Sequence, residues 1–270
     1  MPKIFFIDFD GTLLNDDKSI SQKNIDALKR VQEAGDYLAF TTGRPFYGGD
    51  FLFEHIGISK KNCFLLCFQG ALIYDLYNEK IINTHYMESS LVRELVLDLQ
   101  ERGIYFQAFT KDLMYCFEIN DFTKRYIKIT NEPHKLVESI EDFIKEDIFK
   151  IMAIDYDEKD KLLDFQSYVS FNKKFDCENF FSSEWFLEFT KRGVDKGSAL
   201  KELAAFLDIR IEDTVAIGDE ENDIPMIQAA GVGVAMLNAS DDIKVSADEV
   251  TTVDNNCGGV AEIINKYVSK

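Results

Sequence analysis

Histidine and cysteine are scarce in this chain and poorly placed for holding a metal. The three histidines, His55, His85 and His134, are far apart, and Cys63 and Cys67 have the spacing of neither a zinc knuckle nor a redox pair. The five cysteines are odd in number and scattered, which argues against a disulfide framework. The sequence therefore predicts reduced thiols in the core and no zinc site.

Basic residues are also in short supply. The chain has 30 Lys and Arg against 48 Asp and Glu, which gives a formal net charge of -18 at pH 7. Nucleic acids and anionic membrane surfaces bind proteins that concentrate Lys and Arg, so this balance argues against both as partners. An anionic ligand such as a phosphate ester would be held only where a metal ion or local cations reverse the field.

Long apolar runs are missing as well. The sequence has no uninterrupted apolar stretch of the length that spans a bilayer, so we expect no transmembrane helix. The first predicted strand begins at residue 3, which leaves no room for a signal peptide ahead of it. These absences predict a cytoplasmic protein.

What the sequence does contain is an alternation of apolar strands with amphipathic helices. The expected strands are continuous apolar runs, typical of strands buried on both faces, at residues 4–7, 37–41 and 63–68. The helix after the first strand is expected to begin after Ser21 as N-cap and to end at Gly35. This order predicts an α/β fold with a doubly wound, Rossmann-like parallel sheet.

The alternation stops near residue 82 and resumes near residue 187. A hairpin is expected over residues 71–82, and the stretch after it has adjacent short strands with segregated helices, which is typical of an α+β unit. We expect residues 1–82 and 187–270 to form a discontinuous α/β core. Residues 83–186 are expected to form an inserted α+β domain.

The first strand runs into two carboxylates, Asp8 and Asp10, followed by Gly11. In a strand, a spacing of two points both side chains the same way, and the carboxyl ends of strands are where open α/β sheets bind ligands. Asp-Gly is also a common turn signal, so a solvated turn is the alternative interpretation of this pair.

Polar residues are also found next to other elements of the same predicted sheet. Thr42 follows the second strand, Lys196 opens a later helix, and Asp219, Asn222 and Asp223 follow a later apolar strand. Parallel strands bring their carboxyl ends to one edge of a sheet, so we expect these residues to converge with the aspartates of the first strand.

Individual members of this set have structural alternatives. Thr42 could cap the helix that follows it, and Asn222 with Asp223 could form an ordinary N-cap before Pro225. Lys196 at a helix N-terminus is unfavourable with the helix dipole, which favours a functional role over a solvated surface position. For Thr42 and Asp223 both interpretations stay open.

The combination points to one kind of chemistry. Carboxylates without histidine or cysteine favour a hard cation held by oxygen, Mg²⁺ before Zn²⁺. A threonine hydroxyl, a lysine and helix N-termini suit phosphoryl oxygens. The sequence therefore predicts a magnesium-dependent phosphoryl-transfer site.

These motifs, in this order, resemble those of the haloacid dehalogenase-like superfamily, and within it the Cof-type sugar-phosphatase branch with a large inserted cap domain. The matching segments are Asp8-Phe9-Asp10-Gly11-Thr12-Leu13, Thr41-Thr42-Gly43-Arg44, Lys196-Gly197, and Gly218-Asp219 with Asn222-Asp223. Two positions depart from the family pattern. The usual Asn-Gly-Ala after the third strand is Gln69-Gly70-Ala71 here, and Glu220 stands where a small or amide residue is common.

The resemblance implies distinct roles for the two aspartates of the first motif. Asp8 would attack the substrate phosphorus and become an aspartyl phosphate, which divides the hydrolysis into two steps. Asp10 would protonate the leaving oxygen and then accept a proton from the hydrolytic water.

The resemblance also implies a metal site and a phosphate site. Mg²⁺ would be held by Asp8, the backbone carbonyl of Asp10 and Asp219, with Asp223 supporting the metal from the second shell. The phosphoryl oxygens would be bound by Thr42, Lys196 and Asn222. The inserted domain would be the cap that closes over the site and chooses the leaving group.

The function predicted is hydrolysis of small phosphorylated metabolites, sugar phosphates first, by a Mg²⁺-dependent phosphomonoesterase. A phosphomutase, which returns the phosphoryl group to its substrate, is an alternative within catalysis. A non-catalytic phosphoacceptor or ligand-binding module is the alternative from another class, because response-regulator domains also gather acidic strand ends, a threonine and a lysine around Mg²⁺.

Overall fold

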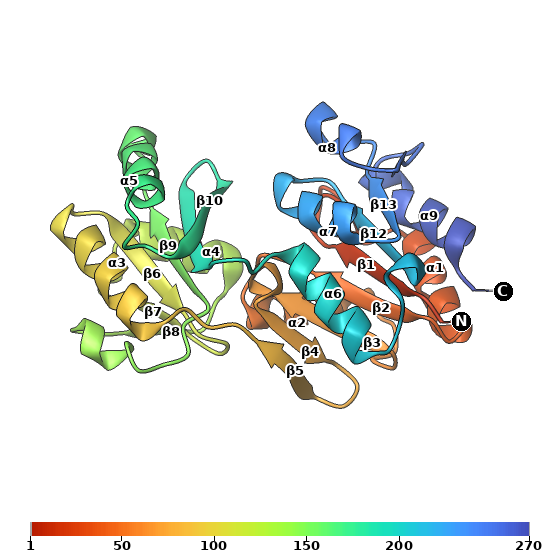
Figure 1. Cartoon of the computed structure of the whole chain (residues 1–270), viewed down its shortest axis with the longest axis horizontal. Helices are drawn as coiled ribbons and strands as arrows, with labels where there is room; N and C mark the ends of the chain where they lie inside the picture. The colour runs from red at the N-terminus through yellow and green to blue at the C-terminus, as the bar shows by residue number, and fades with distance from the viewer. Residues whose placement is uncertain (1, 270) are drawn as a thin grey trace. The chain divides into compact units, whose positions relative to one another are not determined.

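The computed structural model describes residues 2–269, apart from the side chains of Phe51, Leu52 and Ile129. The chain divides into two compact units. The first contains residues up to Gly43, Gly49–Thr84 and the residues from Asp195 onward, and the second contains Arg44–Gly48 and His85–Val194. Each unit is built on its own β-sheet (Figure 1).

The first unit contains a sheet in the strand order β14-β13-β12-β1-β2-β3-β4-β5. Its strands are β1 (Ile4–Asp8), β2 (Tyr37–Thr41), β3 (Cys63–Cys67), β4 (Leu72–Asp75), β5 (Lys80–Thr84), β12 (Thr214–Gly218), β13 (Val232–Ala235) and β14 (Glu249–Val250). The strands from β14 to β3 pair in parallel, whereas β4 and β5 add antiparallel at one edge. The expected doubly wound parallel sheet, with a hairpin after the third strand, is confirmed.

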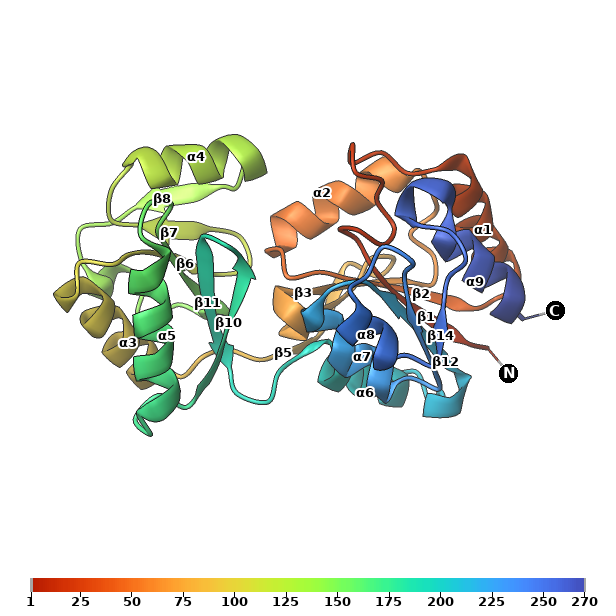
Figure 2. The ribbon, with the colours of Figure 1, turned by 90° about the horizontal axis from the view of Figure 1, so that it is seen from above.

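Helices cover both faces of this sheet (Figure 2). They are α1 (Gln22–Glu33), α2 (Phe46–Ile56), α6 (Lys196–Phe206), α7 (Ile224–Ala229), α8 (Asp241–Val245) and α9 (Gly259–Tyr267). The α1 helix begins as expected, because the side chain of Ser21 accepts a hydrogen bond from the backbone N–H of Asn24. Leu200 and Leu203 of α6 pack with Ile4 and Phe6 of β1 in one apolar cluster, which fixes α6 beside the central strand.

The second unit contains a sheet in the order β10-β11-β9-β6-β7-β8. Its strands are β6 (Tyr105–Phe109), β7 (Met114–Cys116), β8 (His134–Leu136), β9 (Lys150–Ile154), β10 (Cys177–Ser183) and β11 (Phe186–Lys191), and its helices are α3 (Ser89–Glu101), α4 (Asp121–Thr130) and α5 (Lys159–Phe171). All neighbouring strands are antiparallel except β7 and β8. The apolar residues of α3 and α5 pack against one face of this sheet, which gives the unit its own core.

The end of the second unit differs from the boundary expected at residue 186. Strand β11 pairs with both β9 and β10, so it belongs to the second sheet, and the unit ends at Val194. The expected boundary would separate β11 from its partners.

Two expectations from composition can be compared with the structure. The five cysteines are free thiols, as expected, but Cys257 is exposed and so is not part of the core. Within residues 2–269, every helix is too short or too polar to cross a membrane.

Candidate active site

The predicted site residues of the first unit follow neighbouring strands. In the register of the sheet, Asp8 at the end of β1 pairs with Thr41 at the end of β2, one residue before Thr42. Ile7 of β1 pairs with Ile217 of β12, two residues before Asp219. The alignment of the strands therefore places these three polar segments along one edge of the sheet.

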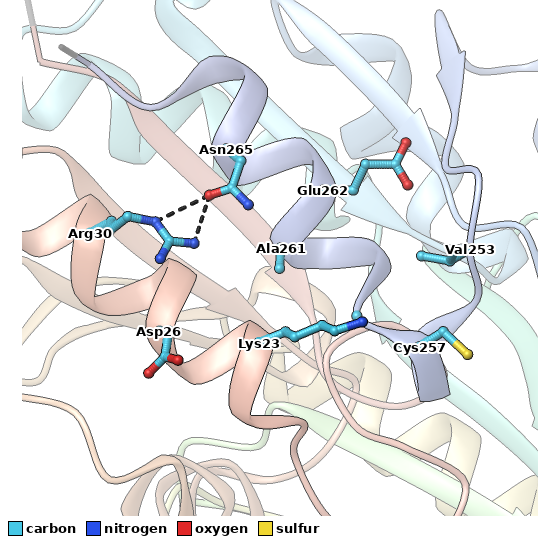
Figure 3. Close-up of a pocket in the computed structure, with 9 residues that line it drawn as sticks. Lys23, Asp26, Arg30, Val253, Cys257, Ala261, Glu262 and Asn265 are labelled. Atoms are coloured by element: carbon cyan, nitrogen blue, oxygen red, sulfur yellow. Dashed lines mark hydrogen bonds between the residues drawn. The ribbon is translucent and has the colours of Figure 1, made fainter.

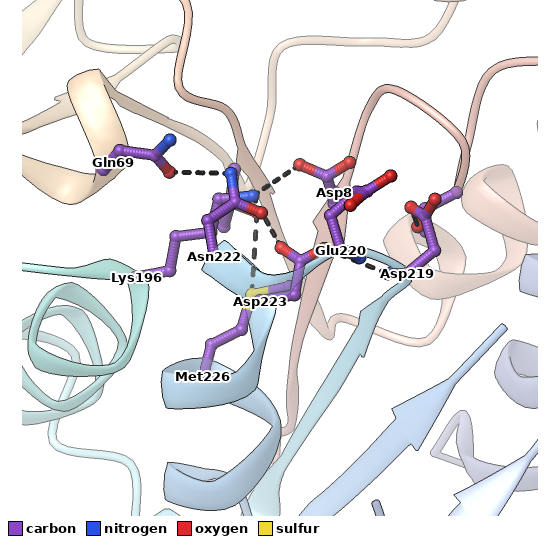
Figure 4. A network of polar contacts seen from close by, with 10 residues as sticks. Asp8, Gln69, Lys196, Asp219, Glu220, Asn222, Asp223 and Met226 are labelled. Atoms are coloured by element: carbon purple, nitrogen blue, oxygen red, sulfur yellow. Dashed lines mark hydrogen bonds and ion pairs between the residues drawn. The ribbon is translucent and has the colours of Figure 1, made fainter. Parts of the chain in front are cut away.

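Lys196, the first residue of α6, connects two of these segments (Figure 4). Its Nζ atom donates hydrogen bonds of 2.6 Å to Oδ1 of Asp8 and 2.6 Å to Oδ1 of Asp223. The lysine side chain has no exposed surface. Burial alone would lower the pKa of Lys196, but the carboxylates of Asp223 and Asp8 raise it above its ordinary value, so the amine is an ammonium.

Asp223 is held by both of its carboxylate oxygens. Oδ1 accepts from Lys196, while Oδ2 accepts from the backbone N–H groups of Asp219 at 2.9 Å and Glu220 at 3.1 Å. The side chain makes no capping bond to the N-terminus of α7, although Asp223 occupies the N-cap position. Its carboxylate thus shapes the loop after β12 instead of capping the following helix.

Asp219 faces the first motif. The hydroxyl of Thr12 donates a 2.6 Å hydrogen bond to its Oδ1, and Gly11 leaves room for the carboxylate, since a Cβ on Gly11 would lie 2.2 Å from Oδ2. Burial raises the pKa of Asp219 to about 7, with Thr12 opposing the shift and Asp223 and Glu220 adding to it. Burial therefore disfavours the ionised form of this carboxyl group unless a cation lies beside it.

Carboxylate oxygens of Asp8, Asp219 and Asp223 all lie within 4.8 Å of one another. Burial, together with the charges of Asp223 and Asp219, raises the pKa of Asp8 and outweighs the opposing effect of Lys196. When all three carboxyl groups are ionised, the ammonium of Lys196 offsets only one of their charges, and a divalent cation would neutralise the rest. The donor set consists of oxygens, as hard cations such as Mg²⁺ require, so the residues present fit that ion.

Asp10 lies in a different environment from Asp8. Its carboxylate is 37% exposed, against 9% for that of Asp8, and its Oδ1 accepts a 2.9 Å hydrogen bond from Nζ of Lys18. Lys18 was not among the residues predicted from the sequence, because nothing in its spacing indicates that the loop turns back toward Asp10. The two aspartates of one motif therefore differ in burial and in partner.

Thr42 and Asn222, the other predicted phosphate-binding residues, are both connected to Gln69. The backbone N–H of Gln69 donates to the carbonyl of Thr42 at 3.1 Å, and the Gln69 Oε1 atom accepts from Nδ2 of Asn222 at 3.1 Å. Thr42 itself is almost fully buried. Gln69 was noted in the sequence only as a departure from a family pattern.

A family model for haloacid dehalogenase-like hydrolases matches residues 5–264 of the chain. The chain belongs to the haloacid dehalogenase-like hydrolase family. The expected resemblance is thereby confirmed, and the match includes both structural units.

Similar proteins support the same assignment of this haloacid dehalogenase-like hydrolase. It is 31% identical to the putative phosphatase M6_Spy0533 of Streptococcus pyogenes serotype M6, over 98% of each chain. It is 30% identical to the 5-amino-6-(5-phospho-D-ribitylamino)uracil phosphatase YcsE of Bacillus subtilis, over 98% of this chain and 96% of that one. A crystal structure of a haloacid dehalogenase-like hydrolase from Bacteroides thetaiotaomicron superposes with a TM-score of 0.88 at 26% identity, covering 98% of this chain and 99% of the other.

This hydrolase also has a groove of about 380 Å³ between α1 and α9 (Figure 3). Its lining carries charges of both signs, including Lys23 and Glu262, and the guanidinium of Arg30 donates to Asn265 across it. The lining includes none of the residues predicted for catalysis or metal binding. The groove is therefore separate from the cluster of polar residues around Asp8.

Proposed function

We propose that this chain is a Mg²⁺-dependent phosphomonoesterase that transfers the phosphoryl group of a small organic phosphate to Asp8 and then to water. The observation that carries the proposal is the buried ammonium of Lys196, bonded to both Asp8 and Asp223 beside Asp219. This arrangement combines a carboxylate nucleophile with a fixed cation and an oxygen-rich metal position.

In the first step, a carboxylate oxygen of Asp8 forms a bond to phosphorus while the bond from phosphorus to the leaving oxygen breaks. Asp10 gives its proton to that leaving oxygen, so the alcohol departs neutral. In the second step, water attacks the aspartyl phosphate, Asp10 takes a proton from the water, and the bond between Asp8 and phosphorus breaks. The products are inorganic phosphate and the original carboxylate.

The difference in side-chain exposure between Asp8 and Asp10 supports these separate roles. Asp8 is held against Lys196 in a buried site, where a fixed nucleophile is favoured, whereas Asp10 is more exposed and exchanges protons more readily with solvent and with a leaving group. The hydrogen bond from Lys18 to Asp10 favours the ionised form of Asp10, which is the form that takes a proton from water in the second step.

Asp8, Asp219 and the backbone carbonyl of Asp10 would hold Mg²⁺, and Asp223 would support them through the loop that it shapes. Bound there, the ion would neutralise charge on the phosphoryl group as it approaches the Asp8 carboxylate. Thr42, Lys196 and Asn222 would bind phosphoryl oxygens. Lys196 suits this task because its position is fixed by two carboxylates before any ligand arrives.

Sugar phosphates are the substrate class we propose first, for a cytoplasmic enzyme acting on phosphorylated metabolites. That a relative is named as a phosphatase for 5-amino-6-(5-phospho-D-ribitylamino)uracil supports a small organic phosphate in general. The second unit would act as the cap domain that selects the leaving group.

The test is a screen of phosphate esters for phosphate release, with Mg²⁺ and with a chelator in its place. We expect release from wild type only with the metal, and none from Asp8→Asn. Asp208→Asn makes the same chemical change at an exposed position after α6 and should retain wild-type rates. Undiminished phosphate release by Asp8→Asn would refute the proposal, and isomerised ester without free phosphate would identify a mutase.

A further inference from the structure

The turn between β3 and β4 has an unusual backbone. Phe68 has φ of 53°, Gln69 has φ of 59° and Gly70 has φ of 96°, so three consecutive residues lie in the left-handed region. Side chains other than glycine, asparagine and aspartate are rare there, because Cβ approaches the backbone. Such conformations persist where surrounding contacts over-determine them, and they cluster at functional sites.

The contacts that hold this turn come from two elements of the candidate active site. On one side, a Cβ on Gly43 would lie 2.4 Å from Nε2 of Gln69, so the glutamine side chain packs directly against the backbone that follows Thr42. On the other side, a Cβ on Gly70 would lie 2.8 Å from the carbonyl oxygen of Asp195, just before Lys196. The turn therefore packs against both the residues after β2 and the start of α6.

The side chain of Gln69 reaches a third element. Its Oε1 accepts the 3.1 Å hydrogen bond from Nδ2 of Asn222, which precedes the Asp223 that binds Lys196 (Figure 4). The other amide atom of Asn222, Oδ1, is buried and has no hydrogen-bond partner among the described residues. With one N–H committed to Gln69, the remaining N–H and the buried Oδ1 of Asn222 are held in one orientation.

We propose that Gln69 is a positioning residue for the phosphoryl-transfer site, which acts by fixing the Asn222 amide. The strained backbone places the glutamine side chain where it contacts Gly43 and accepts from Asn222 at the same time. The kinetic part of this inference rests on the proposed phosphatase function, whereas the structural part does not.

Gln69→Gly removes the side chain but can keep the backbone conformation, so it distinguishes the effects of the two. Glycine adopts a left-handed φ without strain, so the backbone of the turn should keep its shape, and the lost packing of Gln69 against Gly43 should lower the thermal midpoint by only a few degrees. Losing the acceptor for Asn222 should lower kcat on p-nitrophenyl phosphate roughly tenfold, as the removal of residues that hold a ligand-binding side chain in place does elsewhere. Glu79→Gly is the matched control, because Glu79 is exposed in the β4–β5 turn with φ of 51°, and its kcat should be unchanged.

A double-variant comparison tests whether Gln69 works through Asn222. If it does, Gln69→Gly combined with Asn222→Ala should be about as slow as Asn222→Ala alone, because one contact is lost in both. If Gln69 only supports the fold, the fold reductions in kcat of the two single variants should multiply in the double variant. Multiplied losses, or a wild-type kcat in Gln69→Gly, would overturn the inference.

A measurement without substrate keeps the inference testable if no ester is hydrolysed. The side-chain amide signals of Asn222 in a ¹⁵N-correlated NMR spectrum can be identified by their loss in Asn222→Ala. We expect them to shift toward the values of a solvated asparagine in Gln69→Gly and to stay unchanged in Glu79→Gly. Unchanged Asn222 signals in Gln69→Gly would overturn the positioning role, whereas an inactive wild type would overturn only the phosphatase proposal.

Discussion

The ammonium of Lys196 lies 2.6 Å from Oδ1 of Asp223, and neither side chain has any exposed surface. Removing the charge should be costly, because it would leave Asp223 and Asp8 as unpaired buried carboxylates. We expect Lys196→Met to lower the free energy of unfolding by about 3–5 kcal/mol. Loss of the fixed cation should also lower kcat by at least roughly 10²-fold, as for other preorganised donors.

Urea unfolding and phosphate release measure these two effects. Lys201→Met is the control, since Lys201 is an exposed residue of the same helix, and it should change neither quantity measurably. A Lys196→Met protein that unfolds at the wild-type urea concentration would contradict the interpretation of Lys196 as the partner of both carboxylates.

Gly11 offers a test of the metal position in which none of the predicted ligand residues is substituted. Gly11 and Gly35 share a φ of 81°, but a Cβ on Gly11 would lie 2.2 Å from Asp219, whereas a Cβ on Gly35 would have nothing within 4 Å. Both alanine variants should lose about 1 kcal/mol from backbone strain. Only Gly11→Ala should displace Asp219, so only it should weaken Mg²⁺ binding, by roughly 10-fold or more.

Titration calorimetry with Mg²⁺ measures the affinity of each variant directly. Equal Mg²⁺ affinities for Gly11→Ala and Gly35→Ala would show that the close approach of Gly11 to Asp219 does not shape the metal position.

Asp10→Asn should separate ligand binding from proton transfer. The amide has nearly the shape of the carboxyl group and leaves the Asp10 backbone carbonyl in place, but it cannot exchange a proton with the leaving oxygen or with water. We expect phosphate to bind Asp10→Asn with wild-type affinity while kcat falls by roughly 10²- to 10⁴-fold. Rapid-quench measurements should show that both formation and hydrolysis of the intermediate are slower, and a defect confined to phosphate affinity would contradict this role.

The carboxyl group of Glu132, in the second unit, should make the free energy of unfolding depend on pH. It is 2% exposed and its Oε2 has no hydrogen-bond partner within the described residues. Burial raises the pKa of Glu132 from 4.5 to about 7, although Lys150 opposes the shift. The folded state therefore binds a proton more tightly than the unfolded state, and the stability that this proton contributes is lost as the pH rises through about 7.

Glu132→Gln should remove the contribution of this carboxyl group to the pH dependence of the free energy of unfolding. At pH 8 the variant should be more stable than wild type, on the order of 3 kcal/mol, and at pH 5 the difference should fall to about 1 kcal/mol or less. Urea unfolding at both pH values provides the measurement, with the exposed Glu138→Gln as control. A Glu132→Gln protein that loses stability at pH 8 would mean that the ionised carboxylate is needed there.

Much of the fold was predictable because its signals are local. Apolar runs located the strands of the first sheet, and Ser21 marked the start of α1 with the side-chain bond that it makes. The end of the second unit was not predictable in the same way, since β11 joins its sheet by pairing with distant β9 and only residues 192–194 separate it from the first unit.

The candidate site was also predictable only in part. The order of strands sufficed to bring Asp8, Lys196, Asp219 and Asp223 together. The parts played by Thr12, Lys18 and Gln69 depend on the path of three turns, and a single sequence does not specify those paths. A left-handed φ at Gln69, in particular, has no sequence signal, because glutamine is not a residue that favours it.

The way the chain is divided has an evolutionary consequence. Every residue to which we assign a chemical role comes from the unit that the chain leaves and re-enters, while the second unit is almost entirely one continuous stretch, His85–Val194. A single gene segment can therefore diverge, or be exchanged by recombination, without altering a catalytic side chain. Under the proposed role of the second unit in selecting the leaving group, substitutions that change the preferred substrate should fall between residues 85 and 194 more often than substitutions that change the reaction itself.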